Sequence, residues 1–103
     1  MDNGFSGQKV YEKKQDMVWR QVGEETILVP VRREMADLDS VFTLNETAAF
    51  VWSLIDGKLP LADIRDRMVA EFEVEREQAG EDLERCIAKL QEIMAVRELP
   101  DSR

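Results

Sequence analysis

The chain has 103 residues, 44% of them apolar and 35% charged, which is the balance of one soluble globular domain. Its formal net charge of −8 opposes binding to a nucleic acid or to an anionic membrane surface. It has no histidine and one cysteine, so the sequence predicts no catalytic imidazole pair, no metal site and no cofactor. Without an apolar run long enough for a membrane span or a secretory signal, we expect a cytoplasmic protein.

The two ends of the chain differ in composition from its middle. Residues 1–16 are polar, contain Gly4 and Gly7 and show no periodicity, which predicts a flexible arm. Residues 98–103 contain Pro100 and polar side chains, which predicts a disordered tail. Residues 17–97 are therefore the expected folded domain.

The domain is predicted to begin with a small antiparallel sheet. Residues 17–22 and 26–31 are rich in β-branched and aromatic side chains, and Gly23 marks a hairpin turn between them. Pro30 cannot donate to a sheet ladder, so we expect the second strand to stop near it. A charged loop then leads to a third strand over residues 40–44.

A capped helix follows the third strand directly. Asn45 is a good N-cap, because its side-chain oxygen can accept from the free N–H groups of the first turn. An apolar stripe at helical spacing follows, formed by Ala48, Val51, Trp52 and Ile55. Gly57 ends the helix, because glycine adopts the left-handed conformation at little cost. We expect Trp52 to be a core anchor rather than a ligand contact.

Two more helices are predicted after Pro60. The first has an apolar stripe of Leu61, Ile64, Met68 and Phe72, with Arg65 on its solvent face. The second has a stripe of Leu83, Ile87, Leu90 and Met94, widened by Cys86 and Ile93. A small, soft side chain packs well at such a position, so we expect Cys86 to belong to the core rather than to react.

Three strands followed by three helices predict an α+β domain similar to a winged helix-turn-helix. That arrangement suggests a DNA-binding regulator as an alternative function, with the third helix as the recognition helix. Acidic side chains outnumber basic ones along it: Glu77, Glu81, Asp82, Glu84 and Glu92 against Arg76, Arg85 and Lys89. Because such a helix repels phosphates, the sequence disfavours this alternative.

The stretch DSVFTLNETAAFVWSLIDG at residues 39–57, with Asp-Ile at 63–64 and Asp-Leu at 82–83, resembles the central signature of the PqqD family. The namesake of that family is the peptide chaperone of pyrroloquinoline quinone (PQQ) biosynthesis. The resemblance covers residues 17–96. It implies a winged helix-turn-helix fold with three strands and three helices, in agreement with the periodicity.

The resemblance also implies a function, which is binding rather than catalysis. Members of the family bind the leader of a ribosomally made precursor peptide and present it to a radical S-adenosylmethionine maturase. Similar domains take the peptide as an added strand along their third strand, beside the third helix. Carried over to this sequence, the implied binding residues are Val41, Phe42, Thr43, Leu83, Ile87 and Leu90. The alternative for each of these side chains is a place in the core.

Overall fold

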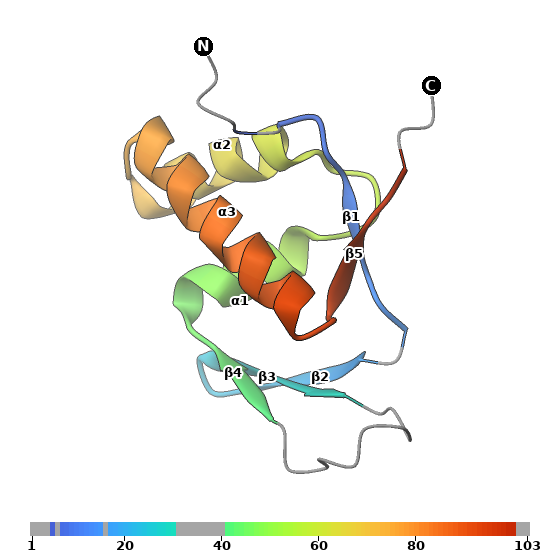
Figure 1. Cartoon of the computed structure of the whole chain (residues 1–103). Coiled ribbons are helices and arrows are strands. Elements are labelled where there is room, and N and C mark those ends of the chain that lie inside the picture. The colour runs from blue at the N-terminus through green and yellow to red at the C-terminus, as the bar shows by residue number, and fades with distance from the viewer. Residues whose placement is uncertain (1–4, 6, 16, 31–40, 101–103) are drawn as a thin grey trace.

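A computed structural model of the chain describes residues 5, 7–15, 17–30 and 41–100. Its elements are β1 (Tyr11–Lys13), β2 (Met17–Val22), β3 (Glu25–Pro30), β4 (Phe42–Leu44), α1 (Glu46–Leu54), α2 (Leu61–Phe72), α3 (Arg76–Glu92) and β5 (Val96–Glu98). The charged loop predicted before the third strand lies outside the described residues. All three helices lie on one side of the sheet formed by β2, β3 and β4 (Figure 1).

The three-stranded antiparallel sheet has the order β2-β3-β4. Its first hairpin turns at Gly23 and Glu24, and Gly23 has a φ of 63°, as expected for a two-residue turn with glycine at its first position. β4 pairs with β3 so that Thr43 lies opposite Ile27. With the three helices, this sheet confirms the predicted α+β class.

The helices begin where the sequence indicates, but the first and the third end early. α1 ends at Leu54 with Ile55 as its C-cap, so Gly57, with a φ of 80°, belongs to the turn that follows rather than to the helix end. The Asn45 side chain accepts a hydrogen bond of 2.8 Å from the Ala48 N–H, which confirms the predicted cap of α1. α3 ends at Glu92, and Met94 has a left-handed backbone with φ 63° and is 42% exposed. The prediction that Met94 continues the core stripe was therefore wrong, because the chain turns there to enter β5.

A second sheet, which the sequence did not predict, joins the two ends of the described chain. β1 and β5 pair antiparallel, with Tyr11 opposite Glu98. These strands have three residues each, too few to show the period of two that marks a strand in sequence. Tyr11 is only 6% exposed, so the core includes a side chain from the segment predicted as a flexible arm.

Trp52 of α1 is the largest side chain of the core and is 1% exposed. Its ring meets the edge of the Trp19 ring from β2 at a centroid distance of 6.3 Å. The Lys13 ammonium lies 5.0 Å from the centroid of the Trp52 ring and donates to the Ile55 carbonyl at 2.7 Å. Trp52 thus connects the helices with both sheets, which confirms the predicted anchor.

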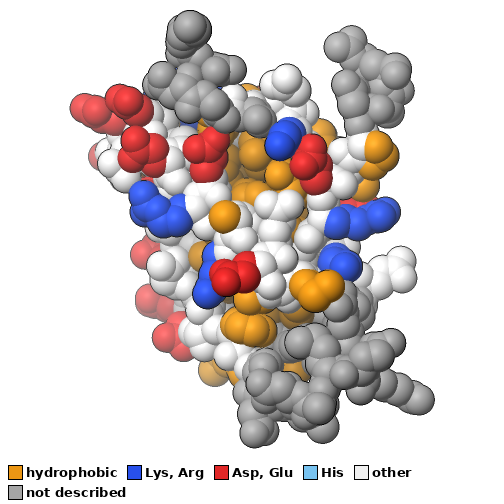
Figure 2. All heavy atoms as spheres, in the orientation of Figure 1, with side chains coloured by type: hydrophobic (Ala, Val, Ile, Leu, Met, Phe, Trp, Pro, Cys, Tyr) orange, Lys and Arg blue, Asp and Glu red, His pale blue; other side chains and the backbone are white. Residues whose placement is uncertain are grey.

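Charged side chains are scattered over the face of the molecule drawn in Figure 2. In Figure 2, acidic side chains gather on the side of this face where α3 begins.

No helix in the described part of the chain has the length and apolar content needed to cross a membrane.

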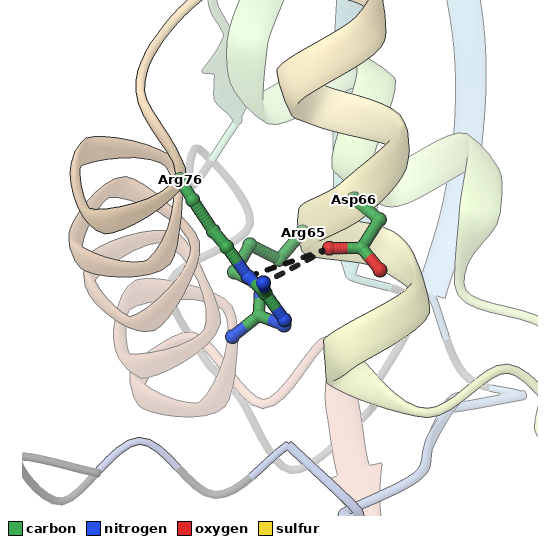
Figure 3. A network of polar contacts seen from close by, with 3 residues as sticks. All are labelled: Arg65, Asp66 and Arg76. Atoms are coloured by element: carbon green, nitrogen blue, oxygen red, sulfur yellow. Dashed lines mark hydrogen bonds and ion pairs between the residues drawn. The ribbon is translucent and has the colours of Figure 1, made fainter. Parts of the chain in front are cut away.

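Arg65 does not lie on the solvent face of α2, so that prediction was wrong. Its side chain is 14% exposed, and its guanidinium lies 4.8 Å from the centroid of the Phe5 ring. The facing position on α3 is Gly80, and an added Cβ there would lie 3.7 Å from Arg65 Cδ, an ordinary van der Waals distance, so the stem of the arginine packs against α3 at this point. Figure 3 shows Arg65 and Arg76 reaching the same oxygen of Asp66, at 3.3 and 4.0 Å.

Candidate functional site

β4 lies at one edge of the three-stranded sheet, and its register shows which backbone groups face outward. The two-residue turn makes Val22 and Glu25 a hydrogen-bonded pair. Successive residues of a strand direct their N–H and C=O groups to opposite edges. Those of Glu25 point to β2, so those of Ile27 also point to β2, and those of Leu28 point to β4, where Phe42 lies opposite. Thr43, the next residue along β4, therefore directs its N–H and C=O away from the sheet.

A groove with a volume of about 390 Å³ lies beside this edge. Its walls come from β4, from the first turn of α1 and from one face of α3. The lining residues are Thr43, Leu44, Asn45, Thr47, Ala48, Asp82, Arg85, Cys86, Lys89 and Leu90. The outward-facing backbone of β4 thus borders a partly apolar groove.

The charges along the α3 wall are nearly balanced. Arg85 lies 3.4 Å from Asp82, and Lys89 lies 3.6 Å from Glu92, in both cases between side chains one helical turn apart. The two basic side chains are largely exposed, so these ion pairs stabilise the helix little and are easily exchanged for other partners. The rim of the groove can therefore accept a peptide without first breaking a strong contact.

Cys86 lies in this wall, half-buried and without a disulfide. Burial raises the pKa of its thiol to about 11, because a thiolate there would lose water. The thiol is therefore protonated at neutral pH and unsuited to nucleophilic chemistry. This agrees with the predicted structural role, although Cys86 borders a groove rather than the centre of the core.

Alkylation of Cys86 should show this pKa directly. We expect the rate with iodoacetamide to rise about tenfold for each pH unit between pH 8 and pH 10, because only the thiolate reacts. The rate of a short cysteine peptide with both ends capped, measured alongside by mass spectrometry, should level off near its own lower pKa of about 8.5. A Cys86 profile that levels off at the same pH as this control would contradict the raised pKa.

The predicted site residues do not all lie in the groove. Thr43 lines it, Leu90 borders its floor but is only 1% exposed and belongs to the core, and Val41 is 53% exposed beside β4. Phe42 is half-buried and packs against the core. Leu83 and Ile87 are 0% and 3% exposed and belong to the core, so the groove is lined by the neighbouring face of α3.

Sequence reasoning missed the residues of that neighbouring face. Asp82, Arg85, Cys86 and Lys89 recur at spacings of three, one and three, which is also a helical stripe. It is polar, and an apolar stripe stands out more clearly, so the pattern pointed to the buried side of the helix. Among the described residues, no group of acidic or cysteine side chains gathers closely enough to hold a metal ion.

The fold and the sequence match known proteins. A family model described as coenzyme PQQ synthesis protein D (PqqD) matches residues 25–94. The fold is similar to that of TbiB1 in complex with the TbiA(beta) leader peptide, with a TM-score of 0.73, 20% identity, and coverage of 87% of this chain and 99% of that one.

A second structure with this fold is the lasso peptide synthetase B1 complexed with the leader peptide. Its TM-score is 0.71 and its identity 23%, and the match covers 87% of this chain and 98% of that one. No curated protein matches the chain. At these identities the two structures show the shared fold, whereas the family model covers more than half of the sequence. The chain therefore belongs to the PqqD family.

Proposed function

We propose that this protein binds the leader segment of a ribosomally synthesised precursor peptide, as a strand added to the free edge of β4. One observation carries the proposal: the outward-facing backbone of Thr43 borders the groove between β4 and α3. An extended peptide placed there gains hydrogen bonds from its own backbone, whatever its sequence. Family membership and the leader-peptide complexes of the two similar structures support it.

The side chains of the groove supply the selectivity that backbone hydrogen bonds lack. Alternate side chains of an added strand point to the same face, so every second peptide residue would enter the groove. Ala48 and Cys86 offer half-buried apolar contacts there, above a floor formed by the buried side chains of Leu44 and Leu90, while Arg85 and Lys89 lie at the rim. We therefore expect apolar peptide side chains to anchor the leader, with acidic ones favoured near the two cations.

We also propose that the bound leader is presented to a radical S-adenosylmethionine maturase, the partner that the family resemblance implies. This chain has no histidine, and the pKa of its only thiol is raised. Its contribution is therefore to hold the precursor in place while a partner carries out the chemistry. Binding both the leader and the enzyme raises the local concentration of the substrate without any new catalytic contact.

A titration with the leader of a precursor peptide encoded beside this protein tests the binding. We expect a dissociation constant of about 1 μM or lower, an affinity of at least about 8 kcal/mol. In heteronuclear NMR spectra, the amide signals of Thr43, Leu44, Cys86 and Lys89 should move. Arg67, exposed on α2 and outside the groove, supplies the control Arg67→Ala, which should bind like the wild type. Shifts confined to residues 7–15 would show that the leader binds elsewhere.

A further inference from the structure

A second hollow, with a volume of about 470 Å³, lies on the opposite face of α1 from the β4 groove. α1 contributes Glu46, Ala49, Phe50, Trp52 and Ser53 to it, whereas it contributes Thr47 and Ala48 to the groove. The other walls come from β2, from the turn after it, from β3 and from the end of α2: Trp19, Gln21, Glu24, Thr26, Glu71 and Phe72. The two sites can thus be occupied at the same time.

Aromatic rings form much of this hollow. Phe50 and Phe72 meet edge to face with centroids 5.3 Å apart, and Trp19 meets Trp52 in the same way. Trp19 is 47% exposed although it lies on the helix-facing side of β2, opposite Leu28. A large ring held in a fixed position but left open to solvent is typical of a contact surface.

Three carboxylates surround these rings, and no described cation pairs with them. Glu24, Glu46 and Glu71 are all exposed, and none forms an ion pair within the described part of the chain. No described lysine or arginine lines the hollow. By comparison, Arg85 and Lys89 line the β4 groove, and each has a carboxylate nearby. The second hollow is therefore the site that attracts positive charge.

The chain itself shows that these rings can hold a cation. The Lys13 ammonium lies 5.9 Å from the Trp19 centroid and 5.0 Å from the Trp52 centroid, within the range of a cation–π contact. Burial lowers the pKa of Lys13, with Asp56 acting in the opposite direction. Within the described ranges, this lysine leaves the three carboxylates of the hollow without an ion pair.

We propose that the hollow between α1, β2 and the end of α2 is a docking site for a lysine or arginine side chain carried on an exposed segment of a partner protein. The carboxylates attract the charged group, and the rings cover its aliphatic stem. A hollow of this volume accommodates one or two such side chains. The proposal goes beyond leader binding, because it adds a second surface with the opposite charge preference.

The test uses the full chain and two capped pentapeptides, one with two arginines and one with glutamates in their place. The readouts are the indole N–H signals of Trp19 and Trp52 and the amide signals of Ala49 and Ser53 in NMR titrations. We expect the arginine peptide alone to shift these signals saturably, and less at high salt because exposed charges are screened. The signals of Thr43 and Cys86 report the β4 groove separately.

The variant Glu24→Gln/Glu71→Gln should weaken binding of the arginine peptide roughly two- to thirtyfold, since each exposed charge pair contributes little by itself. Glu46 is left unchanged because it also stabilises the start of α1. The control Glu81→Gln/Glu84→Gln removes the same charge from exposed positions of α3 outside the hollow and should bind like the wild type.

Several results would overturn the proposal. These are the absence of a saturable shift, equal shifts with both peptides, shifts at Thr43 and Cys86 only, and undiminished binding in Glu24→Gln/Glu71→Gln. Choline binding as tightly as the arginine peptide would instead assign the hollow to small organic cations. Leader binding is measured at other signals, so a negative result here leaves the proposed function standing.

Discussion

Replacing Trp52 with alanine should lower the free energy of unfolding by about 3–5 kcal/mol. The ring is 1% exposed and connects α1 with β2 and with Lys13 of the second sheet, so its removal opens a cavity that three elements would have to close. A domain of this size is stable by only about 5–15 kcal/mol. Urea denaturation followed by far-ultraviolet circular dichroism measures the change.

Trp52→Phe is the matched control. The indole N–H of Trp52 is buried and forms no hydrogen bond with any described residue. Phenylalanine thus keeps most of the packing and loses no hydrogen bond, so its cost should be well below that of alanine. A midpoint for Trp52→Ala close to that of the wild type would show that the ring does not support the core.

Replacing Thr43 with proline should weaken leader binding by about 1–3 kcal/mol, which is roughly 5- to 150-fold. The register directs the Thr43 N–H to the free edge of β4, so proline removes a donor that the added strand would use. Pairing with β3 uses Phe42 and Leu44, and the sheet therefore keeps its own hydrogen bonds. Calorimetric titration measures the affinity, after circular dichroism has shown that the variant is folded.

Thr43→Ala separates the backbone from the side chain. It keeps the N–H and removes only an exposed hydroxyl and methyl group, so it should bind the leader nearly as the wild type does. Equal weakening by alanine and proline would mean that the leader contacts the Thr43 side chain rather than the Thr43 backbone. Wild-type affinity in a folded Thr43→Pro variant would disprove strand addition at β4.

The sequence alone determined the helices and the main sheet. Their signals are local: the cap at Asn45 lies three residues from the N–H it accepts from, and the stripe around Trp52 repeats within one helix. The Gly23 turn fixes the first hairpin for the same reason, since two residues are enough to set its geometry. The family signature at residues 39–57 also lies within one continuous stretch.

Only the tertiary structure decided which face of each element meets which neighbour. β1 and β5 pair across 83 to 87 residues of chain, and strands of three residues leave no period to read. The apolar stripe of α3 faces the core, so the β4 groove is formed by the polar face beside it, including Arg85 and Lys89. Arg65 is covered by the Phe5 ring and by α3 at Gly80, and both of these come from other parts of the chain. Periodicity gives the direction of a side chain around its own helix, whereas burial depends on partners distant in sequence.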